Sequence, residues 1–149
     1  MHKFKTQIQN YLYQNIPLTK IMEIELESLT KSEIKMSAKL KPNKNDKDIA
    51  FAGSIQTLMT ICCWSFIYSW LLEKNISAKL FIRRCSVEFD RQIDRDFTAI
   101  CSIGVRGAKK DFLKNLKNEG KARITLSASI KIENVIAAKF TGEYAAITA

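Results

Sequence analysis

Hydrophobic and polar residues alternate along most of this chain, and the alternation stops over one long apolar stretch. In Ser32–Leu40 and Lys121–Glu133, apolar residues take every second position between charged or hydroxylated ones. A period of two is typical of strands with one buried face. Weaker alternation predicts four further strands, at Met22–Ser28, Phe81–Phe89, Phe97–Val105 and Ile136–Ala146. The total is then about six strands.

Two segments have helical spacing instead. His2–Asn15 carries apolar residues on one helical face, and Pro17 follows it, so we expect a short N-terminal helix within residues 1–16. In Gly107–Gly120, the apolar residues fit a helical turn or two that ends at Gly120. Four lysines lie on this second segment, as a solvated face or as a clamp for phosphates: Lys109, Lys110, Lys114 and Lys117.

The apolar stretch, Ile49–Leu72, contains no charged residue. It is long enough for a transmembrane helix, which needs about 20 apolar residues, or it is a helix buried on all sides. Two features favour burial: the strands have apolar faces that need a cover, and hydroxyl groups recur through the stretch at Thr57, Thr60, Ser65 and Ser69. We therefore expect an α+β hotdog fold over residues 1–149, an antiparallel sheet wrapped round a long central helix.

In the central helix, the large aromatic residues Trp64, Phe66, Tyr68 and Trp70 are expected in the core. In the third strand, Phe81, Cys85, Val87 and Phe89 are expected on one face. Arg83 shares that inward face by its position, so we expect it at a bulge, at an edge used for dimerisation, or against a phosphate or carboxylate of the substrate.

Composition limits the cellular compartments and the kinds of binding partner that we expect. The net charge is +9, which suits a solvated basic surface or a polyanionic partner such as nucleic acid, membrane, coenzyme A or an acidic carrier protein. The four cysteines show no CxxC spacing and read as reduced thiols. The N-terminal residues lack the apolar core of a secretory signal, so we expect a cytoplasmic protein.

Several motifs resemble one family. Pro42-Asn43-Lys44-Asn45 precedes the long helix, Phe51-Ala52-Gly53-Ser54 opens it, and Trp64 lies near its middle. This pattern is similar to that of hotdog thioesterases, closest to the thioesterase domain of the YiiD C-terminal type. The resemblance spans roughly Pro17 to the end of the chain and continues in FLKNLKNEGKARITL and FTGEYAAI. It implies hydrolysis of acyl-CoA or acyl-carrier-protein thioesters. By resemblance to other hotdog proteins, a subset of the aromatic residues in the long helix could line an acyl tunnel.

The resemblance places catalytic residues at the start of the long helix. A helix N-terminus offers unpaired N–H groups and a positive dipole end, so the Gly53 N–H, with that of Ser54, is the candidate oxyanion donor. The alternative is an ordinary helix start with Ser54 as its cap. Asn45 could position water or the thioester carbonyl, or it could simply be a turn residue. Asn43 and Phe51 are the further candidates for substrate contact.

The general base departs from the family pattern. Many related hydrolases place an Asp or Glu early in the central helix, and the resemblance puts that site near Thr60. This helix has no carboxylate before Glu73, and a threonine is a poor base although it can hold a water. Asp46 and Asp48 lie nearby in sequence, where exposed loop acids are the ordinary interpretation.

The sequence lacks the histidines that other kinds of catalytic site need. The only histidine is His2, so we expect neither a Ser/His or Cys/His triad nor a zinc site, and no cofactor. A dehydratase of carrier-bound substrates would need a loop histidine. Two alternatives stay open: a non-catalytic acyl-thioester sensor on the same fold, and a nucleic-acid binder supported by charge alone. Open edge strands predict a homodimer or a dimer of dimers.

Overall fold

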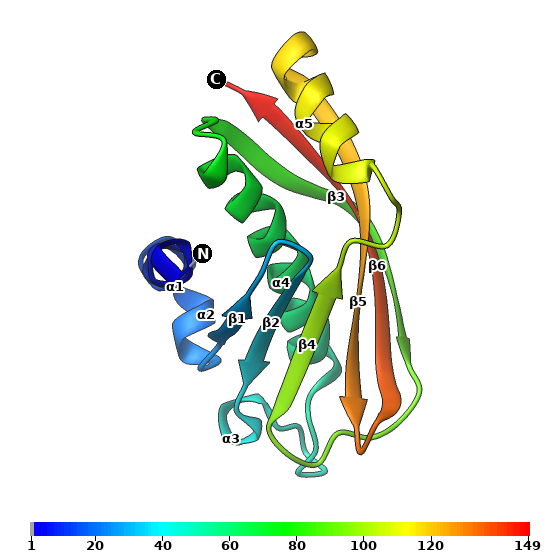
Figure 1. The fold of residues 1–149 in the computed structure, drawn as a ribbon. Coiled ribbons are helices and arrows are strands. Elements are labelled where there is room, and N and C mark those ends of the chain that lie inside the picture. Colours follow the sequence, from blue (N-terminus) through cyan, green and yellow to red (C-terminus); the bar gives the residue numbers. More distant parts are fainter. Residues whose placement is uncertain (1) are drawn as a thin grey trace.

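Six strands form one antiparallel sheet that curls round a long helix, as predicted (Figure 1). The structure is a computed structural model that describes residues 2–149. The strands are β1 (Glu25–Leu29), β2 (Glu33–Ala38), β3 (Ala78–Phe89), β4 (Phe97–Ser102), β5 (Lys121–Ile132) and β6 (Val135–Thr148). The helices are α1 (His2–Asn15), α2 (Pro17–Ile21), α3 (Leu40–Asn43), α4 (Ala52–Glu73) and α5 (Ala108–Glu119). The sheet order β1-β2-β4-β5-β6-β3 leaves β1 and β3 as its edges.

The apolar stretch is α4, and it forms the core of the fold. By length and composition this helix could cross a membrane, but 67% of its most apolar window is buried. Leu58, Cys62 and Phe66 are fully buried against the sheet, whose inner faces are apolar. A helix that is apolar all round finds its cover here inside the protein, which is the second of the two interpretations above.

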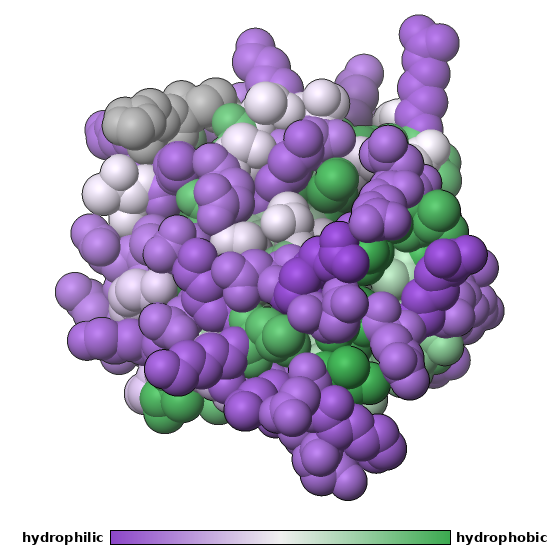
Figure 2. Space-filling view, turned by 90° about the horizontal axis from the view of Figure 1, so that it is seen from below, coloured by the Kyte–Doolittle hydropathy of each residue, from purple (hydrophilic) through white to green (hydrophobic). Residues whose placement is uncertain are grey.

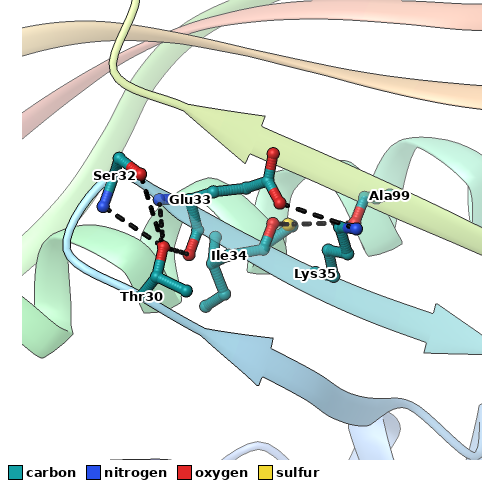
Figure 3. A network of polar contacts seen from close by, with 7 residues as sticks. Thr30, Ser32, Glu33, Ile34, Lys35 and Ala99 are labelled. Atoms are coloured by element: carbon teal, nitrogen blue, oxygen red, sulfur yellow. Dashed lines mark hydrogen bonds and ion pairs between the residues drawn. The ribbon is translucent and has the colours of Figure 1, made fainter. Parts of the chain in front are cut away.

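The contact between α4 and the sheet includes a buried thiol. Cys62 Sγ lies 3.8 Å from the carbonyl oxygen of Ile34 in β2 and 3.6 Å from that of Ala99 in β4. Figure 3 shows this contact beside the turn that joins β1 to β2, where Thr30 Oγ1 accepts the N–H group of Glu33 at 3.0 Å. Burial raises the pKa of the Cys62 thiol well above its usual value, so the thiol stays neutral.

Strand β3 corrects one sequence prediction. Its register against β6 shifts between Ile82 and Arg84, which makes Arg83 the extra residue of a β-bulge. Phe81 therefore opposes Ala145 on the outer face. It does not share the inner face with Cys85, Val87 and Phe89, because an inserted residue reverses the alternation on one side of the bulge.

The segment between β4 and β5 also differs from the prediction. Strand β4 ends at Ser102, so Val105 lies in a loop and is 69% exposed. Helix α5 has 12 residues and ends at Gly120, whose positive φ of 75° suits glycine. Its buried Phe112 packs edge-on against Trp70 at a ring separation of 6.2 Å. Helix α5 thereby covers the C-terminal end of α4.

Candidate active site

The N-terminus of α4 has free N–H groups. Phe51 is the N-cap residue, and no side chain caps the helix, so Ser54 does not take the capping role considered above. The first N–H group bonded in helical fashion is that of Ile55, which donates to the Phe51 carbonyl at 3.0 Å. Within residues 2–149, the N–H groups of Ala52, Gly53 and Ser54 have no hydrogen-bond acceptor. Such groups at a helix start bind anions and anionic transition states.

The side chain of Phe51 lies on Gly53. A Cβ atom added to Gly53 would collide with the Phe51 ring, whose Cδ2 and Cζ atoms would lie 3.1 Å away. The ring is itself 54% exposed, so a bulkier residue at position 53 would push it toward solvent. Only glycine lets this apolar ring rest beside the unpaired N–H groups.

Asn45 shapes the loop before α4 and keeps one donor free. Its Oδ1 accepts the N–H of Lys47 at 2.8 Å and that of Ile49 at 3.4 Å, so the turn interpretation holds for this oxygen. Its Nδ2 has no acceptor within the described residues. Asn45 lines a cavity of about 300 Å³ together with Ala52 and Ile55 of α4 and with residues 89–93.

Asn43 lies beneath this loop and not in the cavity. It is 2% exposed, and its Nδ2 donates to the carbonyl oxygens of Met22 at 2.8 Å and Lys39 at 2.7 Å. Its own carbonyl accepts the Phe51 N–H at 2.8 Å. The prediction of direct substrate contact by Asn43 is therefore wrong, because its side chain is buried; it anchors the loop and Phe51 instead.

Arg83 points away from the start of α4. Its Nη1 lies 3.1 Å from Glu143 Oε1. Glu143 alternates with the buried Gly142 and Tyr144, so this ion pair lies on the outer face of the sheet. Arg83 therefore lies at a bulge, the first of the alternatives considered above, and its side chain does not share the inward face.

A half-open stripe runs along α4 from its N-terminus. The residues that share it are spaced three or four apart and are only partly buried, while the residues between them are buried from Leu58 on; they are Gly53, Thr57, Thr60, Trp64 and Tyr68. Thr60 lies two turns beyond Gly53, about 10 Å along the axis. Its carbonyl accepts the Tyr144 hydroxyl at 2.7 Å, which ties this part of α4 to β6.

Aromatic rings close the far end of the stripe. The Trp64 ring lies 4.9 Å from that of Tyr68 and 5.9 Å from that of Tyr11 in α1. Trp64 Nε1 donates to the carbonyl oxygen of Leu80 in β3 at 3.3 Å. Of the aromatic residues predicted in the core, Phe66 and Trp70 are buried there, whereas Trp64 and Tyr68 line the stripe. The contribution of Tyr11 was missed, because sequence spacing gives no contact between separate helices.

The carboxylates near the cavity are exposed and paired. Asp46 Oδ1 lies 3.1 Å from Lys47 Nζ, and Asp48 Oδ1 lies 2.9 Å from Lys44 Nζ. Seen from this end of the molecule, hydrophilic side chains cover most of the surface and hydrophobic ones form small patches (Figure 2). Among residues 2–149, no group of three His, Cys, Asp or Glu side chains is placed to hold a metal ion.

Comparison with known proteins identifies the family of this chain and supports its fold. A family model described as "Putative thioesterase (yiiD_Cterm)" matches residues 5–148. A protein of unknown function from Chlorobaculum tepidum has a similar structure, with a TM-score of 0.92 and 26% identity over 97% of this chain and 94% of that one. A "putative thioesterase" from Shewanella oneidensis matches with a TM-score of 0.89 and 22% identity over 99% of both chains. A "probable thioesterase" from Pseudomonas aeruginosa matches with a TM-score of 0.80 and 14% identity over 97% of this chain and 95% of that one. These similarities confirm the predicted hotdog fold.

Proposed function

Since the chain belongs to the family described as putative thioesterases of the YiiD C-terminal type, we propose that it hydrolyses acyl thioesters of coenzyme A or of an acyl carrier protein. The observation that carries this proposal is the uncapped start of α4. There the N–H groups of Ala52, Gly53 and Ser54 are unpaired, and Ala52 lines the cavity together with Asn45. Oxyanion stabilisation by preorganised N–H groups is a large contribution to acyl-transfer catalysis.

In the proposed reaction, the thioester carbonyl oxygen accepts the Gly53 N–H, assisted by that of Ser54. A water molecule held by Asn45 Nδ2 attacks the carbonyl carbon, and negative charge develops on the carbonyl oxygen. The C–S bond then breaks, one proton of the attacking water passes to the departing thiolate, and the free acid and thiol leave. The positive end of the α4 dipole favours the charge at the intermediate.

The acyl chain follows the half-open stripe of α4 in this proposal. Thr60 borders its path and can hold a water molecule. Trp64, Tyr68 and Tyr11 give the far end an apolar wall of stacked rings. Because aromatic walls provide large apolar contact area, they suit an acyl chain better than a polar group.

The site is proposed to form between two copies of the chain. Edge strand β3 has 12 residues with an unpaired side, and it exposes Phe81, Ile82 and Phe89 at 49%, 38% and 49%. A long exposed edge with apolar side chains is a surface for strand pairing. Pairing of β3 with β3 of a second copy would give a homodimer, alone or within a dimer of dimers, and would bring that copy beside the stripe. The cysteines, free in the structure, suit a cytoplasmic enzyme.

One observation favours a second candidate function. The only carboxylate of α4 is Glu73, which lies at the C-terminal end and pairs with Lys109 at 3.2 Å. A site with an oxyanion donor but no base on the helix would bind acyl thioesters without turning them over. A non-catalytic sensor of acyl thioesters on the same fold is therefore the alternative.

The deciding experiment is mass-spectrometric detection of free acid from a panel of acyl-CoA and acyl-carrier-protein thioesters. The Asn45→Asp variant keeps the Oδ1 acceptor of the turn and loses the Nδ2 donor, so we expect stability to hold and turnover to fall by about 10²-fold. Asn10→Ala, at an exposed position of α1, is the matched control. Binding of acyl thioesters without turnover in the wild-type protein would replace the hydrolase by the sensor.

A further inference from the structure

A basic groove lies at the opposite end of α4 from the candidate active site. A cavity of about 760 Å³ is lined by Lys74 and Ile76, which follow α4, and by residues of α5 that include Lys114 and Lys117. A second cavity, of about 440 Å³, continues it past Lys109 and Lys110 and shares Lys74 and Leu113 with it. Figure 1 shows α5 at the end of the molecule that also holds the C-terminus, far from α3.

The groove combines an apolar floor with unneutralised positive charge. Its floor is formed by Ile76, Leu113 and Leu116. Within residues 2–149, no carboxylate lies within 4 Å of the amino groups of four lining lysines, namely Lys74, Lys110, Lys114 and Lys117; Lys109 alone pairs with an acid. These cations surround one concave surface, which gives a field that attracts phosphate groups.

We propose that this groove, the α5 groove, binds the adenosine and phosphate part of a coenzyme A thioester. The lysines complement the phosphates, and the apolar floor accepts the adenine ring. The larger of its two cavities, about 760 Å³, lies within the usual range of about 300–1,000 Å³ for small-molecule sites. A concave surface with apolar residues in its lining suits a nucleotide better than the convex surface of a carrier protein. This assignment rests on the proposed thioester hydrolysis.

The α5 groove serves the site of the other copy in the proposed dimer. Helix α4 has 22 residues and is therefore about 33 Å long, farther than an extended pantetheine arm can reach from the groove to Gly53 of the same chain. Strand β3 begins beside the groove, just after Ser77, and ends at Phe89, which lines the Asn45 cavity. Antiparallel pairing of two β3 strands along their length sets the start of each beside the end of the other.

The binding test uses adenosine 3′,5′-bisphosphate, which carries the adenosine and ribose phosphate of coenzyme A without the thioester arm. We expect isothermal titration calorimetry to show binding that weakens with salt and falls about tenfold in Lys114→Gln/Lys117→Gln. The control Lys20→Gln/Lys31→Gln removes the same charge from exposed positions elsewhere and should bind like the wild type. No binding, or equal binding by all three proteins, would show a solvated basic face only.

The kinetic test separates the groove from the active site. The groove variant should raise KM about tenfold for acyl-CoA and leave KM unchanged for the acyl-pantetheine that lacks the nucleotide. A loss seen with an acyl carrier protein but not with acyl-CoA would overturn the assignment in favour of carrier docking. A further outcome is that no thioester is hydrolysed while the bisphosphate binds to the wild type and more weakly to the groove variant. The proposed hydrolysis would then be refuted, and the proposed nucleotide site would be supported.

The trans arrangement predicts complementation between inactive subunits. Dimers that combine one Asn45→Asp subunit with one Lys114→Gln/Lys117→Gln subunit, isolated by two affinity tags, pair an intact groove with an intact loop at one of their two sites. At low acyl-CoA concentration their turnover should exceed that of either homodimer severalfold. Turnover no higher than in the homodimers would show that the groove does not act across the β3 pairing.

Discussion

Replacement of Gly53 by alanine should abolish activity and spare the fold. The added methyl group would collide with the Phe51 ring, which would swing away because it is the end of a flexible side chain and already 54% exposed. Little apolar burial is then lost. Alanine is favoured over glycine in helices by up to about 1 kcal/mol, so the free energy of unfolding should stay within about 1 kcal/mol of the wild-type value.

The effect on catalysis should be much larger. The methyl group would occupy space beside the N–H group of residue 53, where the thioester carbonyl is proposed to lie, and the apolar ring of Phe51 would no longer cover it. Loss of one oxyanion donor lowers kcat by about 10²–10³-fold, or about 3–4 kcal/mol. Free-acid release measured beside urea denaturation therefore separates the two quantities.

The control is Gly104→Ala, because a Cβ atom at Gly104 meets nothing within 4 Å. This variant should keep both activity and stability. Wild-type turnover by Gly53→Ala would refute the assignment of the oxyanion site. A loss of several kcal/mol of stability would instead refute the argument that Phe51 yields freely.

Three further outcomes follow from the packing. Stability to urea should fall between pH 8 and pH 10.5. Burial raises the pKa of Cys62, Cys63 and Tyr144 in the folded protein, whereas the unfolded chain loses the thiol protons near pH 9.0 and the phenol proton near pH 10.0. A flat stability profile would contradict this. Tyr144→Phe, which loses the hydrogen bond to Thr60, should lower the free energy of unfolding by about 1 kcal/mol in the same assay. Phe81→Lys should shift light-scattering mass from dimer toward monomer, because it replaces an exposed apolar side chain of the proposed pairing edge by a charge; an unchanged mass would remove β3 from the interface.

The long-period features of the fold were predictable from the sequence, because they depend on which faces are apolar. The absence of charge over Ile49–Leu72 predicted α4, and strict alternation over Lys121–Glu133 predicted β5. A bulge was one of the expected places of Arg83, but its effect on the register of β3 was not predictable in the same way. A single inserted residue leaves the neighbouring pattern readable in two registers, and only the pairing with β6 selects one.

The candidate site was predictable only where it is local in sequence. Gly53 and Asn45 lie in one short segment, so a motif could mark them. The packing of Tyr11 against Trp64 joins α1 to α4, and the approach of Phe89 to the start of α4 joins residues far apart in the chain. The same holds for the α5 groove, where Lys74 and Lys117 meet only after α5 packs on the end of α4.

The absence of an acid at Thr60 sets the balance between hydrolase and sensor. General base catalysis contributes about 10²–10⁴-fold, and an oxyanion donor contributes about 10²–10³-fold. The nearby Asp46 and Asp48 are solvated and paired with lysines. Asp90 lines the Asn45 cavity, but its side chain is 43% exposed and lies 3.9 Å from Lys139 Nζ, so none of the three replaces a helix carboxylate. Hydrolysis at this site therefore depends on the Gly53 N–H and on a positioned water. Because no base removes a proton from this water, a hydroxide ion in its place attacks more readily, and turnover should rise with pH up to the onset of unfolding. A carboxylate base would instead give a plateau above its pKa.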